Sequence, residues 1–458
     1  MNTKQPHTSP GNSSERMNWD SLLSTKRFGQ EKYHDDRKHS RTDFQRDYDR
    51  LIFSSPFRRL QNKTQVFPLP GSVFVHNRLT HSLEVACVGR SLASMVAGEL
   101  ATRYEGEPWL PKLSEIGAVV GAACLAHDLG NPPFGHSGEK AIATYFSEGK
   151  GIRLQEFMSR QQWADLTHFE GNANAFRLLT HQFNGRREGG FALTYTTLAS
   201  IVKYPFSSTL AGTKQKFGFF ATETESFRRI ADELGLLRKD ESGNRYARHP
   251  LVFLVEAADD ICYQIMDIED AHKLKLLTTA ETKELFFGYF SEERAKKIAR
   301  TFEVVTDINE QIAYLRSCVI GTLVDECVQA FLDHEEELLT GTLEKPLISF
   351  ISEIPQKAYD ACTAKAWERL YRSSDVVDIE LAGHQIISVL LDKLIFAVEN
   401  QDKSYARLLV DRIPAQYETQ SESRYERVMA VLDYISGMTD VYALDLYRKI
   451  YGMSLPSL

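Results

Sequence analysis

An uninterrupted apolar stretch at residues 116–125 runs into the pair His127-Asp128 and then into a turn-forming sequence. The stretch contains no charged residue and predicts a buried helix. Gly130 is expected to supply a left-handed position that ends the helix, and Pro132 prevents its continuation. Neighbouring helical side chains point about 100° apart, so His127 and Asp128 could reach one ion only where the last turn loosens. The pair therefore resembles half of a metal site, although taken by itself it also fits a capped helix end.

Helical periodicity dominates the rest of the chain. Residues 1–24 are rich in Pro, Ser, Asn and Thr and predict a disordered leader. Residues 189–220, rich in Gly, Thr, Phe and Tyr, favour a small β hairpin or an irregular insertion. No sequence repeat and no long Pro/Gly linker interrupts the helical signal, so we expect one continuous, mainly α domain. Apolar residues recur at helical spacing in segments that span residues 79–100, 116–129, 170–181, 223–236, 251–271, 292–312, 320–339, 381–399 and 425–451.

The composition is that of a globular protein with an ample core. The chain has 458 residues, of which 43% are hydrophobic and 25% are charged. Its formal net charge of -8 argues against a protein that coats nucleic acid non-specifically. No apolar run reaches the roughly 20 residues that span a bilayer, and residues 1–20 lack the apolar core of a signal peptide. The six cysteines include no C-x-x-C pair, so we expect reduced thiols in a cytoplasmic protein with no membrane partner.

A second apolar segment, residues 251–271, carries acidic groups on one stripe. Asp259, Tyr263 and Asp267 follow one another at four-residue spacing and therefore line one side of a helix. Burying a carboxylate costs several kcal/mol unless the carboxylate is paired or bound to a metal. We therefore take Asp259 as a candidate metal ligand. An amphipathic surface helix with one charged face is the alternative interpretation.

Basic and histidine residues in shorter motifs offer further candidates. Arg78 and His81 lie three residues apart on one face of a predicted helix, where His81 could bind a metal and Arg78 an adjacent anion. A histidine at such a position is also compatible with a hydrogen-bonded core residue. Arg59 and the pair Lys203-Tyr204 are each compatible with an exposed loop. The order of these motifs along the chain is more informative than any one of them.

In that order, the motifs resemble those of the HD-domain deoxynucleoside triphosphate triphosphohydrolases, the family of the bacterial dGTPase and of the mammalian dNTPase that restricts retroviruses. The likeness covers well over half of the chain, from about residue 41 to residue 270 and again at 434–447. One position departs from many relatives, because Asn131 stands where a His commonly follows His-Asp-Leu-Gly. The motifs that carry the resemblance are Phe57-Arg58-Arg59-Leu60 with Lys63-Thr64-Gln65-Val66, residues 77–84, residues 127–136, residues 169–173 and residues 256–261.

The resemblance implies a metal-dependent hydrolase with an HD-type helical fold. Residues 25–458 are then expected to form a single HD-type phosphohydrolase domain with a C-terminal helical extension. In this family water attacks the α-phosphate of dGTP or of several dNTPs, and the deoxynucleoside and inorganic triphosphate are released. The histidine and aspartate donors of the family's metal site suit Mg²⁺, Mn²⁺ or another divalent transition metal. The pattern H…HD…D implies as metal ligands His81, His127, Asp128 and Asp259.

The resemblance also implies roles for residues around the metal. His136 and Glu139 match the catalytic acid/base pair of the family. Tyr263 is expected to pack against the sugar face where a 2′-hydroxyl would clash, and Asp267 with Gln65 to bind the 3′-hydroxyl. The groups expected to hold the triphosphate are Arg78, Lys203 and Tyr204, with Arg59 in support.

Partners and alternatives follow from the same comparison. Relatives assemble as oligomers, commonly hexamers, so we expect a homo-oligomer, with an allosteric dNTP or single-stranded DNA as a further partner. Another HD phosphohydrolase, such as a nucleoside 5′-monophosphatase or a hydrolase of alarmones or cyclic dinucleotides, would share the metal ligands but need no Lys203, Tyr204 or Gln65. A nucleotide- or single-stranded-DNA-binding regulator with a vestigial site is the non-enzymatic alternative. The complete ligand pattern and an intact His136 argue against it.

Overall fold

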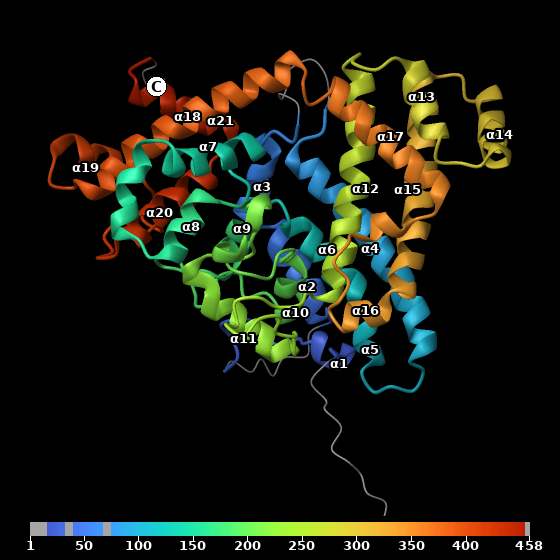
Figure 1. Ribbon diagram of the computed structural model, residues 1–458, viewed down its shortest axis with the longest axis horizontal. Helices are drawn as coiled ribbons and strands as arrows, with labels where there is room; N and C mark the ends of the chain where they lie inside the picture. Colours follow the sequence, from blue (N-terminus) through green and yellow to red (C-terminus); the bar gives the residue numbers. More distant parts are fainter. Residues whose placement is uncertain (1–15, 33–39, 67–74, 454–458) are drawn as a thin grey trace, which may run out of the picture.

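The computed structural model describes residues 16–32, 40–66 and 75–453. Over these ranges the chain forms 21 α-helices, and its β pairing is limited to isolated bridges (Figure 1). The prediction of a mainly α fold is confirmed. Short 3-10 helices link several of the α-helices, at Leu60–Asn62, Lys150–Phe157, Ser208–Leu210, Gly212–Lys214, Ala221–Glu223, Thr301–Glu303 and Leu347–Phe350.

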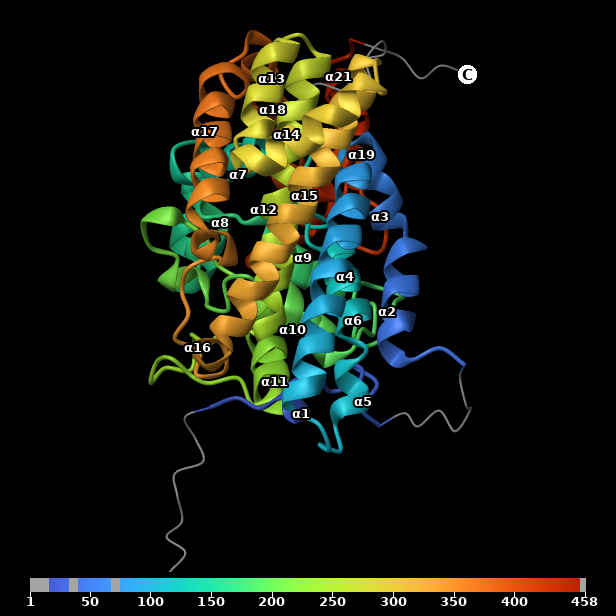
Figure 2. The same ribbon diagram turned by 90° about the vertical axis from the view of Figure 1, so that its right-hand side faces the viewer.

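The larger of two hydrophobic cores holds most of the helices. They are α1 (Trp19–Leu22), α2 (Asp43–Ile52), α3 (Ser55–Arg59), α4 (Arg78–Arg103), α5 (Leu110–Leu113), α6 (Ile116–Ala126), α9 (Gly171–Thr180), α10 (Tyr195–Ile201), α11 (Thr224–Leu234), α12 (Pro250–Lys273), α13 (Thr279–Phe287), α14 (Glu292–Arg300), α15 (Ile308–Asp333), α16 (Glu335–Leu339) and α17 (Glu353–Arg369). Helices α6, α12 and α15 pack around α4 (Figure 2). Asn77 starts α4 with a capping box to Thr80, and Pro250 occupies the first turn of α12.

The second hydrophobic core lies among the C-terminal helices and α7. Its helices are α7 (Gly135–Ser147), α8 (Arg160–Thr167), α18 (Ser374–Glu399), α19 (Ser404–Val410), α20 (Arg424–Ser436) and α21 (Asp440–Ile450). Helix α18 is long and apolar enough to cross a membrane by length and composition, but Ile387, Leu391 and Leu394 are buried in this core. Because α7 begins soon after α6 ends, the turn between these two helices passes from the larger core to the second core.

The predicted disordered leader extends too far. Residues 1–15 lie outside the described residues, but α1 is helical, and its Trp19 and Leu22 are buried. The Trp19 indole donates a 2.9 Å hydrogen bond to the carboxylate of Glu335, which lies far along the chain. The prediction was wrong at this end because the few apolar residues dock on distant helices, and local composition does not reveal such long-range contacts.

One helix boundary in the C-terminal half also differs from the prediction. The expected helices 292–312 and 320–339 meet at a different place, because the break falls at residues 301–307. Asp307 caps α15 by accepting a hydrogen bond from a backbone N–H of its first turn. Residues 313–319 contain neither Gly nor Pro, so nothing there ends the helix.

Two further segments are more broken than their patterns indicate. The expected helix 425–451 is interrupted after α20, and Thr439 caps α21 with its side chain. Residues 189–220 were expected to form a small β hairpin or an irregular insertion. They form an irregular insertion and no β hairpin. This segment contains α10, two 3-10 helices and an isolated bridge between Ser207 and Phe219.

Candidate active site

A cavity of about 330 Å³ opens between α4, α12, the turn from α6 to α7 and the segment that follows α10. All but two of the site residues predicted from the sequence line this cavity, and the roles of these residues stay predictions. The predicted residues in its lining are Gln65, Arg78, His81, His127, Asp128, His136, Glu139, Lys203, Tyr204, Asp259 and Tyr263.

In the turn after α6, one ring nitrogen of His127 forms a hydrogen bond, and the other has no hydrogen-bond partner among the described residues. Nδ1 donates a 2.6 Å hydrogen bond to the carbonyl oxygen of Cys124. Nε2 is buried with no hydrogen-bond partner among the described residues, and it lies 3.7 Å from Asp128 Oδ2 and 3.6 Å from Asp259 Oδ1. Burial lowers the pKa of His127, but the carboxylates of Asp128 and Asp259 outweigh burial and raise it, so this nitrogen favours a bound cation, either a proton or a metal ion.

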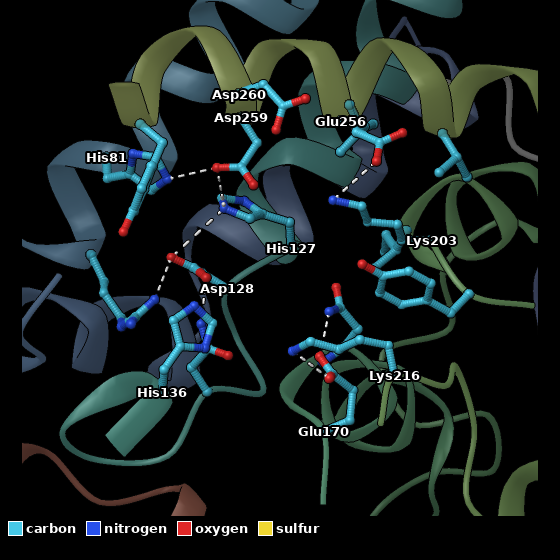
Figure 3. Close-up of a pocket in the computed structure, with 18 of the residues that line it drawn as sticks. His81, His127, Asp128, His136, Glu170, Lys203, Lys216, Glu256, Asp259 and Asp260 are labelled. Carbon is cyan, nitrogen blue, oxygen red and sulfur yellow. Dashed lines mark hydrogen bonds and ion pairs between the residues drawn. The ribbon is translucent and has the colours of Figure 1, made fainter. Parts of the chain in front are cut away.

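Helices α4 and α12 bring the remaining donors to the same point (Figure 3). His81 Nε2 lies 3.0 Å from Asp259 Oδ1. One donor atom from each of His81, His127 and Asp128 lies within 4.8 Å of the others. Two imidazoles and two carboxylates form the mixed nitrogen and oxygen donor set that divalent transition metals accept. The residues at this point therefore fit a divalent metal ion.

Both carboxylate oxygens of Asp128 accept hydrogen bonds. Arg78 donates to Oδ2 at 2.8 Å, and the side-chain amide of Asn131 donates to Oδ1. Asn131 stands at the position where the chain departs from many relatives of the resembled family. Its contact shows that it orients a candidate ligand, and such contacts tune metal affinity.

The turn between α6 and α7 differs from the prediction in one detail. Gly130 was expected in the left-handed conformation, but the residues of this turn with positive φ are Phe134, at 63°, and Gly135, at 57°. Gly130 is required for a different reason, since a Cβ there would lie 2.1 Å from the backbone nitrogen of Ala175. Helix α9 therefore packs directly against the turn that carries the His-Asp pair.

The surroundings keep both acidic donors ionised. Burial opposes ionisation of Asp128, but the adjacent Arg78 guanidinium together with the imidazoles of His127 and His81 outweighs burial and lowers the pKa of Asp128. Burial also opposes ionisation of Asp259, yet the imidazoles of His127 and His81 hold the pKa of this carboxyl well below its ordinary value. Both groups are therefore anionic at neutral pH, which is the state that binds a metal cation.

Near its start, α7 carries a histidine and a glutamate at the edge of the cavity. His136 Nδ1 lies 2.8 Å from Glu139 Oε2, and this hydrogen bond raises the pKa of His136. The other Glu139 oxygen accepts a 2.8 Å hydrogen bond from the backbone N–H of Gly171. The His136 side chain is 66% exposed, so its second ring nitrogen can reach a molecule in the cavity. A carboxylate-held imidazole is suited to general acid or base catalysis.

Two lysines face the metal-ligand candidates across the cavity (Figure 3). Lys203 pairs with Glu256 at 3.1 Å, and Lys216 pairs with Glu170 at 2.6 Å. Burial lowers the pKa of each lysine, but the neighbouring carboxylates outweigh burial, so the pKa of both is raised. Together with Arg78, these ammonium groups make the cavity suitable for a multiply charged anion.

Several polar lining residues were not predicted from the sequence, among them Lys216, Glu170 and Asn172. Asn172 donates a 2.6 Å hydrogen bond to Glu170. Both stand in the motif at residues 169–173, so that motif was the signal that could have identified them. Lys216 follows a short 3-10 helix in an irregular segment, and no periodicity distinguishes it there.

Gln65 and Tyr263 line both the main cavity and a small neighbouring one of about 10 Å³. The Gln65 Oε1 atom is buried without a hydrogen-bond partner in the part of the chain that the structure describes. Asp267 lines only the small cavity, where it accepts a 2.6 Å hydrogen bond from the Tyr371 hydroxyl. Burial raises the pKa of Asp267 to about 8. Asp267 therefore lies beside the main cavity and adjacent to Gln65.

Arg59 lies outside the main cavity. It lines a separate cavity of about 590 Å³ together with Arg50, Arg186 and Tyr417. Burial lowers the pKa of Arg59. Its side chain therefore faces a different space from the other residues expected to hold a triphosphate.

Comparison with known families agrees with this geometry. A model described as "HD domain" matches residues 78–204, which include three of the four metal-ligand candidates and His136. A model described as "Phosphohydrolase-associated domain" matches residues 351–449, which include most of the second core. The first match ends at Tyr204, so the fourth candidate, Asp259 on α12, lies beyond it.

Individual relatives match over nearly their whole length. A Synechocystis protein named deoxyguanosinetriphosphate triphosphohydrolase-like protein is 38% identical, over 96% of this chain and 100% of its own. A Pseudomonas aeruginosa protein of the same name is 37% identical over the same shares. A deoxyguanosinetriphosphate triphosphohydrolase of Salmonella paratyphi A is 30% identical, over 90% of this chain and 94% of its own. From this extent of similarity, the chain belongs to the deoxyguanosinetriphosphate triphosphohydrolase family of HD-domain phosphohydrolases.

Proposed function

We propose that this protein is a metal-dependent hydrolase that converts deoxynucleoside triphosphates into deoxynucleoside and inorganic triphosphate. The observation that carries the proposal is the buried Nε2 of His127, which has no hydrogen-bond partner among the described residues and lies among carboxylates. Lys203 and Lys216 face this point across the cavity. A cluster of metal donors opposite two cations suits a substrate that carries several phosphate groups.

The metal would be held by the donors at the ends of α4 and α6 and on α12. When bound, a divalent ion supplies Lewis acidity toward a phosphate oxygen and lowers the pKa of water. The donor set is compatible with Mg²⁺, Mn²⁺ and other divalent transition metals. The proposed ligands are His81, His127, Asp128 and Asp259.

The chain's own residues account for the remaining chemistry. Water adds to the α-phosphorus, the bond to the 5′-oxygen breaks, and triphosphate departs with the new oxygen. The deoxynucleoside 5′-oxygen needs a proton to leave. His136 is the donor in this proposal, because the hydrogen bond with Glu139 raises its pKa and so favours the protonated imidazole. Arg78, Lys203 and Lys216 bind the phosphate oxygens and stabilise the charge that develops on them.

Sugar selection is proposed to take place at the wall shared with the small cavity. Tyr263 would close the space beneath C2′, so that a 2′-hydroxyl clashes with its ring. Gln65 has an unpartnered buried oxygen among the described residues, which suits a hydrogen bond from a 3′-hydroxyl. Asp267 lies beside Gln65 and would complete this contact. A substrate that lacks the 3′-hydroxyl would leave these buried groups unpaired.

A hydrolysis panel tests this proposal. The purified protein is incubated with each dNTP and each NTP in Mg²⁺ or Mn²⁺, and the products are separated by anion exchange. Inorganic triphosphate from dNTPs, with far less from NTPs, is the expected result. Release of pyrophosphate or orthophosphate, or equal hydrolysis of NTPs and dNTPs, would contradict it. The Asp259→Ala protein, purified in parallel, shows how much activity comes from contaminating phosphatases.

A further inference from the structure

Asp440 lies where the C-terminal helices touch the wall of the cavity. It is the first residue of α21 and is only 8% exposed. One of its carboxylate oxygens accepts a 2.9 Å hydrogen bond from the backbone N–H of Phe134, and the other accepts a 2.8 Å hydrogen bond from that of Thr64. One side chain therefore holds two backbone segments that are distant in the sequence.

Each of these segments leads directly to a residue of the site. Thr64 precedes Gln65, and Phe134 lies two residues before His136. Phe134 has φ 63° and ψ 17°, a left-handed conformation that a residue with a large side chain adopts only when its surroundings hold it there. The hydrogen bond that the Phe134 N–H donates to Asp440 is such a restraint. Without it, the turn that starts α7 can relax.

Lys63 makes a second link between the same parts of the chain. Its side chain is buried, and Nζ donates hydrogen bonds to the carbonyl oxygens of Asn131 at 2.6 Å and Ser436 at 2.7 Å. Asn131 is the residue that orients Asp128. The end of α20 is therefore tied to the turn that carries the metal-ligand candidates.

Helix α18 supports the start of α7 from another direction. The Ser137 hydroxyl donates a 3.0 Å hydrogen bond to the carbonyl oxygen of Glu380. A Cβ at Gly383 would lie 2.8 Å from Phe134 Cβ, so the Phe134 side chain packs too closely against α18 for any larger residue at this position. Among the described residues, α18 to α21 supply no side chain to the cavity lining, yet they fix the backbone that shapes it.

We propose that Asp440 is a positioning residue for hydrolysis, whose two carboxylate oxygens fix the backbone segments that present Gln65 and His136 to the substrate. The proposal rests on the proposed function and gives the phosphohydrolase-associated region a role in it. Among the described residues, Asp440 does not line the cavity, and its carboxylate accepts its hydrogen bonds from these two N–H groups. Its loss therefore affects turnover and sugar selection and leaves the metal ligands in place.

The test compares Asp440→Asn and Asp440→Ala with Tyr425→Phe in the full-length protein. The Asn side chain keeps one acceptor oxygen, so it can satisfy only one of the two N–H groups. Tyr425→Phe is the matched control, because it removes a buried 2.5 Å hydrogen bond from α20 to Asp165, away from the cavity. This control loosens the contact of the C-terminal helices without touching Phe134 or Thr64.

We expect kcat for dNTPs to fall by about 10-fold or more in Asp440→Asn and further in Asp440→Ala, since small displacements of a catalytic group are costly. The preference for dNTPs over dideoxynucleotides should narrow in the same variants. Their metal content should equal that of the wild type. Tyr425→Phe should keep the wild-type kcat. An equal loss of kcat in Tyr425→Phe would show that general loosening is the cause, and would overturn the proposal.

Hydrogen–deuterium exchange supplies a readout that needs no activity. Peptides that contain Thr64 or Phe134 should exchange faster in Asp440→Ala than in the wild type, and at the wild-type rate in Tyr425→Phe. Unchanged exchange in both peptides of Asp440→Ala would overturn the proposal. A wild-type protein that hydrolyses no dNTP would refute the proposed function instead, and the exchange rates would still show whether Asp440 holds the two segments.

Discussion

At the scale of single residues, the tautomer of His127 is set by a backbone contact rather than by a metal. Its Nδ1 donates to the Cys124 carbonyl oxygen, which leaves Nε2 as the nitrogen with a free lone pair. Asn131 and Arg78 hold the neighbouring Asp128 in the same way. Donors oriented in advance need little rearrangement when an ion binds. Removing a metal ligand and removing the proton donor should therefore have separable effects on metal content and on kcat.

Asp259→Ala and His136→Ala should differ in metal content. Asp259→Ala removes a proposed ligand, so both metal content and hydrolysis should collapse. His136→Ala should keep the metal and still bind dNTP, but lose about 10²-fold or more in kcat, as expected when a positioned proton donor is removed. Elemental analysis and steady-state kinetics make the comparison. Unchanged metal content in Asp259→Ala would refute that ligand, and near-normal kcat in His136→Ala would assign the acid to another group.

Sugar selection should divide between two side chains. Tyr263→Ala opens the space beneath C2′, so it should admit NTPs and leave discrimination against dideoxynucleotides largely intact. Gln65→Ala should narrow the gap between dNTPs and dideoxynucleotides by about 1 to 3 kcal/mol without admitting NTPs, because an unpaired buried group no longer penalises the dideoxy substrate. The ratios of kcat/KM among dNTPs, NTPs and dideoxynucleotides test whether the two side chains have these separate roles. If either variant changed both preferences equally, the two roles would not be separate.

At the scale of helices, α12 shows what periodicity predicts and what it omits. The expected helix 251–271 is observed as Pro250–Lys273, and Asp259 and Tyr263 lie on its cavity side. Long apolar patterns of this kind identify helices because burial of one face stabilises them. The ordered motifs likewise brought most of the lining together. Lys216 escaped prediction because it reaches the cavity from an irregular segment, and α1 because it docks on helices distant in the sequence.

The start of α12 should make stability depend on pH through His249. Its ring accepts a 3.2 Å hydrogen bond from the Leu251 N–H and donates a 3.1 Å hydrogen bond to the Leu22 carbonyl oxygen. Burial lowers the pKa of His249 from 6.5 to about 4. The unfolded chain therefore takes up this proton first as the pH falls. The stabilisation is complete above pH 6.5 and is lost between about pH 6.5 and 4, by about 3 kcal/mol.

The variant His249→Gln isolates this effect. A glutamine can keep both hydrogen bonds but does not titrate. Urea unfolding at pH 7.5 and pH 4 should show that the wild type loses about 3 kcal/mol more than the variant over this interval. Equal losses in both proteins would mean that the pKa of His249 is the same in the folded and the unfolded chain, and would contradict this prediction.

At the scale of the whole molecule, a buried ionic cluster joins the two cores. Arg177 on α9 donates to both oxygens of Asp433 on α20, at 2.9 and 2.8 Å, and to Glu223 at 2.7 Å. All three side chains are buried, and Asp433 and Glu223 outweigh burial to raise the pKa of Arg177. The second core supports the start of α7, so this cluster holds together the two parts that shape the cavity.

Arg177→Met should lower the free energy of unfolding by about 3 to 5 kcal/mol, because it leaves two carboxylates buried without a cation. Urea unfolding measures this loss. Arg228→Met provides the comparison, since Arg228 forms an exposed pair with Glu225 and its loss should change stability little. Comparable effects in the two variants would show that the buried cluster does not hold the cores together.

The central claim is that water attacks the α-phosphorus and that the triphosphate leaves intact. Hydrolysis of a dNTP in ¹⁸O-labelled water, followed by mass spectrometry of both products, tests it directly. We expect one ¹⁸O atom in inorganic triphosphate and none in the deoxynucleoside, because the bond between phosphorus and the 5′-oxygen breaks. Label in the deoxynucleoside, or release of pyrophosphate and a deoxynucleoside monophosphate, would contradict the account.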